Sequence, residues 1–235
     1  SIIPKIDKKI ITYGIHDKNA DFRAEKIFQK NGKVSFEAIF RDNKIKVRLN
    51  IPGEHNILNA LAALVVCDFM GLNLEHITKS LNEFSGVNRR FDFHRNENQL
   101  MIIDDYAHHP VEVKFVIDTI KKNWTRRLIT IFQPHLFSRT KQFYKDFAKA
   151  LKSSDVVLIT EIFASREKLD KSVTSKLIVD EMKKIEHNNV QFVEYDNVKS
   201  EVKKLYRSGD IILTAGAGNI WRKAIELNQF LIKND

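Results

Sequence analysis

The stretch Leu100-Met-Ile-Ile-Asp-Asp-Tyr-Ala-His-His-Pro110 joins a short apolar run to a dense group of polar side chains. Its four leading apolar residues predict a buried β-strand. The closing proline suits the first turn of a helix, because that position needs no N–H donor. The polar residues at 104–109 would then lie between the carboxyl end of a strand and the amino end of a helix. In open α/β sheets ligands bind at such turns, and the free N–H groups of the helix start favour anions.

Two interpretations of this turn follow from its residues. Asp and His are common near helix starts, so these side chains could serve only as caps. However, five polar or titratable side chains fall within six positions, which is more than capping requires. These side chains are Asp104, Asp105, Tyr106, His108 and His109. The density favours a functional site over capping alone.

Composition indicates a globular protein with one large or two small domains. The chain has 235 residues, of which 43% are hydrophobic, and only 4 prolines and 8 glycines. No apolar run approaches the ~20 residues of a membrane span, and no secretory signal is present. The single cysteine, Cys67, cannot form an internal disulfide, and its apolar neighbours predict a buried thiol. We therefore expect a cytoplasmic protein that does not bind membranes.

The net charge of +9 allows binding to nucleic acid or another polyanion. The densest basic cluster consists of Lys121, Lys122, Arg126 and Arg127. It falls at a predicted helix end, where cations complement the helix dipole. Other lysines are spread through the chain and interleaved with acidic residues, so a solvated surface is favoured and no nucleic-acid partner is expected.

The first third of the chain has an antiparallel pattern. Residues 9–15, 22–29, 33–40 and 44–49 predict strands, with Asn31-Gly32 and Asp42-Asn43 as hairpin turns. Two helices are predicted at 54–70 and 74–84, and the first is apolar nearly all round. The polar connection at 85–91 marks a boundary. We expect two domains, residues 1–88 and 89–235.

The second part alternates between strands and helices. Strands at 91–94 and 100–104 predict a hairpin, and further strands are predicted at 127–132, 156–160, 190–193 and 211–214. The helices between and after them are predicted at 110–122, 140–151, 172–186, 197–207 and 219–231. This alternation predicts an α/β domain with a doubly wound, mostly parallel sheet. Because parallel strands end at one edge, Asp105, His108, His135, Arg139 and the Gly216/Gly218 turn should converge there.

Several features of the sequence argue against a dinucleotide, phosphate-loop or metal site. The turn at Gly216 is a weak dinucleotide fingerprint, since Trp221 replaces the third glycine and the turn follows the last strand. A tight turn that lets backbone approach a ligand or a neighbouring loop is favoured. No Gly-x-x-x-x-Gly-Lys-Ser/Thr phosphate loop occurs. His108, His109 and His135 could ligate a metal, but no cysteine or ordered carboxylate set accompanies them, so no metal site is expected in this chain.

Two asparagines near the first predicted helix have two open interpretations. Asn56 and Asn59 are three residues apart, so they share one helical face, with His55 beside them. Asn56 could cap the helix and Asn59 could be a surface residue. Alternatively, their amides could contact the edge of a purine base.

Five motifs in order along the chain resemble the Mur ligases. They are Gly-x-His-Asn-x-x-Asn-Ala-Leu-Ala-Ala at 53–63, Gly-Val-x-Arg-Arg-Phe at 86–91, Asp-Asp-Tyr-Ala-His-His-Pro at 104–110, Phe-Gln-Pro-His-x-x-Ser-Arg-Thr at 132–140 and Gly-Ala-Gly-Asn-Ile at 216–220. The third and fourth motifs resemble most closely the alanine-adding member of that family. The resemblance implies the second half of the family's central ATPase domain at 1–88 and its Rossmann-like C-terminal domain at 89–235. The phosphate loop and magnesium carboxylates of the family would lie upstream, so this piece alone is expected to be inactive.

The resemblance also implies an activity, which is the ATP-dependent joining of L-alanine to UDP-N-acetylmuramate through an acyl phosphate in peptidoglycan synthesis. ATP and Mg²⁺ would be the cofactors. His55, Asn56, Asn59, Arg90 and Asp105 would contact ATP, whereas Tyr106, His108, His135 and Arg139 would line the alanine pocket. Of these, His108 and Arg139 would act directly on the reacting amino acid.

The chain departs from many alanine-adding members at one place. Leu136-Phe137 stands where they have Arg-Tyr, which leaves more of the carboxylate contact to Arg139. Two alternatives to the alanine-adding activity are a recycling ligase that adds a murein tripeptide and a nucleotide-binding module without catalysis.

Overall fold

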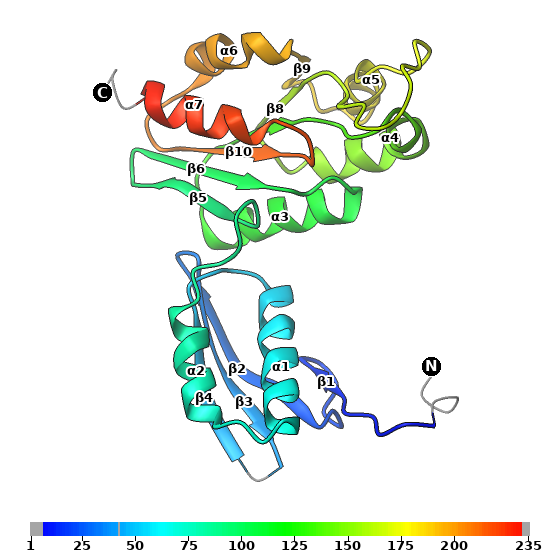
Figure 1. The fold of residues 1–235 in the computed structure, drawn as a ribbon. Helices are drawn as coiled ribbons and strands as arrows, with labels where there is room; N and C mark the ends of the chain where they lie inside the picture. Colours follow the sequence, from blue (N-terminus) through cyan, green and yellow to red (C-terminus); the bar gives the residue numbers. More distant parts are fainter. Residues whose placement is uncertain (1–6, 42, 232–235) are drawn as a thin grey trace. The chain divides into compact units, whose positions relative to one another are not determined.

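The computed structural model describes residues 7–41 and 43–231 (Figure 1). The chain divides into two compact units, Ser1–Gly86 and Val87–Asp235. Each unit has its own hydrophobic core, so each is described by itself. Asp42, half of a predicted hairpin turn, lies outside the described residues.

The first unit packs two helices against a small sheet. Its strands are β1 (Tyr13–Gly14), β2 (Phe22–Lys30), β3 (Lys33–Phe40) and β4 (Asn43–Leu49), in the order β1-β2-β3-β4. The helices are α1 (Glu54–Phe69) and α2 (Leu74–Glu83). Strands β2, β3 and β4 form the predicted antiparallel meander, and Asn31 and Gly32 both have positive φ in the turn between β2 and β3. Helix α1 packs against this sheet through buried side chains, among them Ile57, Leu61 and Leu64.

The strand predicted over residues 9–15 is present, but its length and its pairing direction were predicted wrongly. Only Tyr13 and Gly14 form a strand, and this strand pairs with β2 in parallel, not antiparallel. The Asp21 carboxylate accepts hydrogen bonds from the Thr12 backbone N–H at 2.7 Å and from the Thr12 hydroxyl at 2.8 Å. The Asp21 side chain therefore binds the segment before β1, where the backbone hydrogen bonds of an antiparallel pair were expected. Cys67 also differs from expectation, because it is half-buried.

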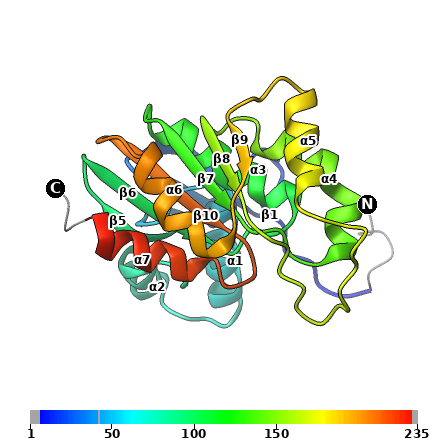
Figure 2. The ribbon, with the colours of Figure 1, turned by 90° about the horizontal axis from the view of Figure 1, so that it is seen from above.

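The second unit has a six-stranded sheet between two layers of helices (Figures 1 and 2). Its strands are β5 (Asp92–Asn96), β6 (Leu100–Asp105), β7 (Leu128–Phe132), β8 (Val156–Ile159), β9 (Val190–Phe192) and β10 (Asp210–Ala215). Its helices are α3 (Pro110–Asn123), α4 (Phe137–Leu151), α5 (Lys176–Lys184), α6 (Val198–Leu205) and α7 (Trp221–Leu231). One apolar cluster joins the sheet to α3, α4 and α5, and another joins it to α6 and α7. The predicted doubly wound, mostly parallel sheet is confirmed.

Strand order decides which turns become neighbours. The sheet runs β5-β6-β10-β7-β8-β9, with only β5 antiparallel to its neighbour. The last strand, β10, therefore lies between β6 and β7. Ala215 is in register with Asp105 on one side and with Phe132 on the other, so three turns start at the same level of one edge.

Two predicted helix bounds need correction. Helix α4 begins at Phe137, not at residue 140, so Arg139 lies in its first turn. Helix α5 begins at Lys176, not at residue 172, because Ser172 instead closes a turn by donating its backbone N–H to the Asp170 carboxylate at 2.9 Å.

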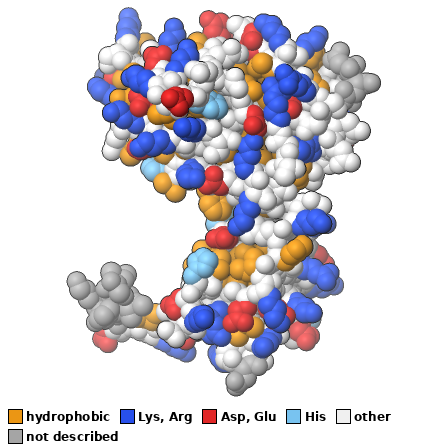
Figure 3. Space-filling model, turned by 180° about the vertical axis from the view of Figure 1, so that it is seen from behind, with side chains coloured by type: hydrophobic (Ala, Val, Ile, Leu, Met, Phe, Trp, Pro, Cys, Tyr) orange, Lys and Arg blue, Asp and Glu red, His pale blue; other side chains and the backbone are white. Residues whose placement is uncertain are grey.

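Charged side chains of both signs cover both units. Figure 3 shows Lys and Arg distributed over each unit with Asp and Glu among them. Across residues 7–41 and 43–231, no helix has both the length and the apolar character that crossing a bilayer requires.

Candidate active site

The turn that follows β6 contains both a cap and a set of buried acceptors. His109 is the N-cap of α3, and its side chain accepts a hydrogen bond from the Val111 N–H. Glu112 completes a capping box by accepting from the backbone N–H groups of His108 at 3.0 Å and His109 at 3.1 Å. Capping therefore accounts for His109. The His108 ring also lies near Glu112, with Nδ1 3.4 Å from its carboxylate, and the two aspartates of the turn have other partners.

Asp104 is the centre of a buried polar network. It is fully buried and accepts from the Thr214 hydroxyl at 2.6 Å and from Arg89 Nε at 3.2 Å. The same guanidinium donates to the carbonyls of Gly216 at 2.5 Å and Gly218 at 3.2 Å. Burial raises the pKa of Asp104, while Thr214 and Arg89 oppose that rise. Arg89 therefore joins the segment that precedes β5 to the ends of β6 and β10, a role that the sequence did not reveal.

Asp105 organises the backbone around it. Its carboxylate accepts from the N–H of Phe91 at 2.8 Å and from the N–H of Ala107 at 2.7 Å. The residue is only 5% exposed, and burial raises the pKa of its carboxyl group to about 6 against these two hydrogen bonds. It therefore holds the 89–91 segment against the turn that leads into α3.

The raised pKa of Asp105 predicts a pH-dependent stability. The folded unit holds this proton more tightly than the unfolded chain does, so ionisation of Asp105 destabilises the folded unit as the pH rises from 4 to 7. The change from 3.8 to about 6 corresponds to about 2 kcal/mol over this interval. Asp105→Asn lacks this ionisation. Between pH 4 and pH 7, the change in its free energy of unfolding should therefore be more positive than that of the wild type by about 2 kcal/mol.

Denaturant unfolding followed by tryptophan fluorescence measures this effect, because both tryptophans, Trp124 and Trp221, lie in the second unit. Asp146→Asn, at an exposed position of α4, is the matched control and should keep the wild-type pH dependence. Identical pH dependence in Asp105→Asn and the wild type would contradict the assignment.

Four ring and guanidinium groups form a continuous row from the β6 turn to the β7 turn. The Tyr106 and His108 ring centroids are 5.3 Å apart, and those of His108 and His135 are 5.8 Å apart. Arg139 Nη1 lies 3.3 Å from His135 Nδ1. Arg90 also lies near Tyr106, with its guanidinium carbon 5.7 Å from the ring centroid. The second unit thus brings together the predicted site residues that it contains.

The electrostatics of this row indicate the state of His135. Burial lowers the pKa of His135, and the charges of Arg139 and His108 lower it further. A neutral ring can accept a hydrogen bond at Nδ1 from Arg139 and then carries its proton at Nε2. His108 Nδ1 lies 3.1 Å from the Tyr106 carbonyl oxygen, which can only accept, so Nδ1 carries a proton.

Two residues of the turn after β8 also border the row, and the sequence analysis did not name them. Phe163 stacks on His135 with centroids 5.9 Å apart and planes 15° apart. Glu167 accepts from the Ser138 hydroxyl and, at 3.1 Å, from the Ser138 N–H at the start of α4. The rule that ligands gather at the carboxyl ends of parallel strands applies equally to β8, so it could have found both residues.

The glycine turn after β10 packs against a neighbouring loop, as expected. A Cβ at Gly218 would lie 2.2 Å from Gln133 Oε1 and 2.6 Å from Phe163 Cγ. Gln133 also donates to Asn219 Oδ1 at 2.8 Å and accepts from the Ile220 N–H at 3.2 Å. These glycines are therefore needed for the close approach of the β7 and β10 turns.

Gly218→Ala should destabilise the second unit by about 1–3 kcal/mol, because the added methyl group overlaps two packed side chains. Tryptophan fluorescence during urea unfolding measures this change. In a Phe163→Ala background the same substitution should cost less, since one of the two overlaps is gone. Equal costs in both backgrounds would show that contact with Phe163 is not the cause.

The three candidate residues of the first unit lie in the first turns of α1. The N-cap is Gly53, so Asn56 does not cap the helix; its side-chain amide donates to the Pro52 carbonyl at 2.7 Å. Asn59 Nδ2 lies 3.5 Å from Asn56 Oδ1, and both His55 and Asn59 are exposed. No group of three or more His, Cys, Asp or Glu side chains suited to a metal ion occurs in residues 7–41 and 43–231.

Comparison with known families matches both units. The description "Mur ligase, glutamate ligase domain" fits residues 89–218, and "Mur ligase middle domain" fits residues 2–67. The chain belongs to the Mur ligase family. The predicted resemblance is thereby confirmed.

The relatives include UDP-N-acetylmuramate–L-alanine ligases. The one from Dictyoglomus turgidum is 40% identical over 227 residues, which is 94% of this chain and 48% of the relative. The one from Acetivibrio thermocellus is 36% identical over 225 residues, also 94% and 48%. The crystal structure of UDP-N-acetylmuramate-alanine ligase from Thermotoga maritima matches with a TM-score of 0.80 and 28% identity, covering 96% of this chain and 48% of that one. This Mur ligase chain thus spans about half the length of these relatives.

Proposed function

We propose that this chain is part of an ATP-dependent ligase that joins L-alanine to UDP-N-acetylmuramate in peptidoglycan synthesis. The observation that carries the proposal is the 40% identity to a ligase of this name over 94% of the chain. The row from Tyr106 to Arg139 at the carboxyl edge of the sheet supports it. In this proposal residues 1–88 are the last part of the middle domain and 89–235 the C-terminal domain.

The amino acid would bind along the row at the carboxyl edge. Arg139 has a guanidinium fork that matches the carboxylate of L-alanine. The neutral ring of His135 and the ring of Tyr106 would form the walls of the pocket. In its neutral form His108 would keep the proton on Nδ1 and offer Nε2 to the proton that the alanine ammonium group must lose before its nitrogen can attack.

Each unit offers its own group of residues for the nucleotide. His55, Asn56 and Asn59 present amides and an imidazole on one side of α1 for the adenine. Arg90 is exposed and would balance phosphate charge, while the buried Asp105 carboxylate would hold the 89–91 segment, which carries Arg90, in place for the nucleotide. When bound, ATP would supply the phosphoryl group that turns the muramyl carboxylate into an acyl phosphate, from which phosphate leaves as the amide forms.

Mg²⁺ would bind mainly through the phosphates of ATP, and the described residues hold no cluster of three ligating side chains. The proposal therefore assigns no step through Mg²⁺ to this chain. We place the reaction in the cytoplasm, where the single free thiol of Cys67 would stay reduced.

A chimera tests the activity. It joins the first half of the Dictyoglomus turgidum relative to this chain, and the intact relative is the positive control. The expected result is ADP release that requires both UDP-N-acetylmuramate and L-alanine. A folded chimera that releases ADP only with a murein tripeptide would be a recycling ligase. One that binds ADP but turns over with neither amino-acid substrate would be a nucleotide-binding module, and either outcome would overturn the proposal.

A further inference from the structure

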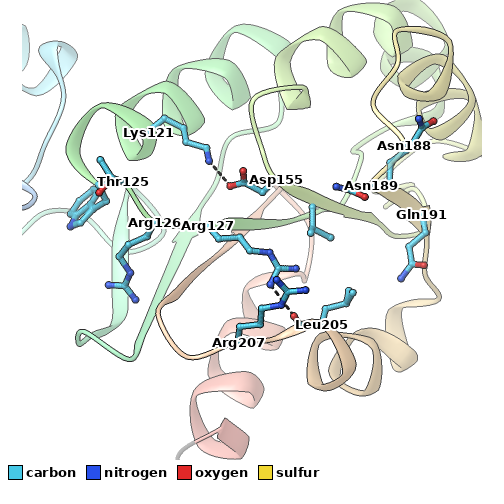
Figure 4. A pocket seen from close by; sticks show the side chains of 13 residues that line it. Lys121, Thr125, Arg126, Arg127, Asp155, Asn188, Asn189, Gln191, Leu205 and Arg207 are labelled. Carbon is cyan, nitrogen blue, oxygen red and sulfur yellow. Dashed lines mark hydrogen bonds and ion pairs between the residues drawn. The ribbon is translucent and has the colours of Figure 1, made fainter.

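An open pocket of about 910 Å³ lies at the edge of the second unit's sheet opposite to the candidate active site (Figure 4). Its lining includes the residues that immediately precede β7, β8 and β9, namely Arg127, Asp155 and Asn189, together with Arg207 shortly before β10. Parallel strands begin at one edge, so these positions come together although they are far apart in sequence. None of them takes part in the proposed ligase chemistry.

Two arginines of the pocket are held rigidly. Arg126 donates to three backbone carbonyls, those of Gly209 at 2.5 Å, Asp210 at 2.8 Å and Glu97 at 3.0 Å. Arg127 Nη1 lies 3.1 Å from both the Leu205 carbonyl and the Asp210 carboxylate. Carbonyl acceptors orient a guanidinium group without neutralising its charge, so Arg126 keeps its full positive charge at the rim.

Positive charge exceeds negative charge at this place. Lys121 forms an ion pair with Asp155, and Arg127 forms one with Asp210. Arg126 and Arg207 add two further cations, so four cations against two carboxylates leave a net charge of +2. Both of these arginines, together with Arg127, act on the same Asp210 carboxylate and oppose the rise in pKa that its burial causes. The cations are therefore concentrated at one end of the pocket.

Donors remain available around the pocket. Arg207 is exposed, and within residues 7–41 and 43–231 its guanidinium makes no hydrogen bond or salt bridge. Figure 4 shows the side chains of Asn188, Asn189 and Gln191 on the side away from the arginines, and all three are exposed. Gln191 Nε2 already donates to Glu201 at 3.5 Å, so a ligand here would meet guanidinium groups at one end and the side-chain amides of Asn188 and Asn189 at the other.

We propose that this pocket binds a small phosphate-bearing molecule with at least two negative charges. Guanidinium forks match phosphate oxygens, and a ligand charge of −2 or more would balance the local excess. The pocket size suits a small molecule, and the site is independent of the ligase activity proposed above.

Titration of the ¹⁵N-labelled chain with pyrophosphate at constant ionic strength tests the site. Saturable shifts are expected at the backbone amides of residues 188–191 and 207. Arg207→Gln should weaken this binding about 5–10-fold, since it removes the cation without other hydrogen-bond partners. Arg222→Gln, an exposed arginine at the start of α7, is the matched control and should keep the wild-type affinity.

Three results would overturn the proposal. One is the absence of saturable shifts at 188–191 and 207. Another is equal affinity in Arg207→Gln and Arg222→Gln. The third is a titration with sodium chloride that produces the same shifts as pyrophosphate, which would show general screening of charge. Shifts at the amides of Ala107 and His108 in place of those at 188–191 and 207 would report binding at the opposite edge, and they belong to the first of these results. Tighter binding of pyrophosphate than of inorganic phosphate would further support recognition of the multiply charged ligand.

Discussion

Arg89→Ala should lower the free energy of unfolding of the second unit by about 3–5 kcal/mol. The substitution leaves the fully buried Asp104 carboxylate without its cationic partner, because Thr214 is then its only remaining side-chain donor among the described residues. It also frees the carbonyls of Gly216 and Gly218. Urea unfolding followed through Trp124 and Trp221 measures the loss.

The neighbouring arginine supplies the control for this substitution. Arg90 is exposed, and its guanidinium lies 5.7 Å from the Tyr106 ring centroid, so Arg90→Ala should cost less than about 1 kcal/mol. Adding Asp104→Asn to Arg89→Ala should recover part of the lost stability, since the uncompensated buried charge is removed. Equal costs for the two alanine variants would contradict the proposed role of Arg89.

Arg139→Ala should raise the KM for L-alanine by about 10-fold or more in the active chimera. The reason is the loss of a charge-assisted pair with the amino-acid carboxylate, worth about 1.5–3 kcal/mol. Arg139→Lys keeps the charge but loses the fork, so its KM should lie between those of the wild type and the alanine variant. An unchanged KM would remove Arg139 from the alanine pocket.

Arg139→Ala should also have an effect that can be measured without any enzyme activity. Burial and the positive charge of Arg139 together hold the pKa of His135 below its usual range. In Arg139→Ala that pKa should rise, and NMR titration of the His135 ring in this chain measures the shift. Arg166→Ala, at an exposed position, serves as the control and should leave the His135 titration unchanged.

Much of the architecture was predictable from local patterns. The apolar runs before Asp105, His135 and Gly216 are strands, and the alternation of strands and helices indicates a parallel sheet. Convergence of the three following turns then follows from geometry, and the contact between His108 and His135 agrees with it. These features were readable because each depends on a few consecutive residues or on a general property of parallel sheets.

Other features depend on partners far away in sequence. Strand order places β10 between β6 and β7, and only this order allows Arg89 to reach Gly216 and Gly218. Phe163 borders His135 because the β8 turn folds over it. The predicted strand at 9–15 failed on a shorter-range contact, since the Asp21 carboxylate, nine residues further along, takes up the Thr12 donors.

The sequence by itself determined the elements, the parallel sheet, the family and the edge at which polar turns gather, because periodicity, turn residues and motifs are local. Only the tertiary structure decided which charges are buried, which donors are already used and where cations accumulate. The cluster near Arg126 and Arg127 looked like an ordinary helix end in sequence. Folding brings Arg207 next to this cluster. The guanidinium groups of Arg126 and Arg127 then donate to backbone carbonyls. Burial and hydrogen-bond partners arise from contacts between distant segments, so no local pattern encodes them.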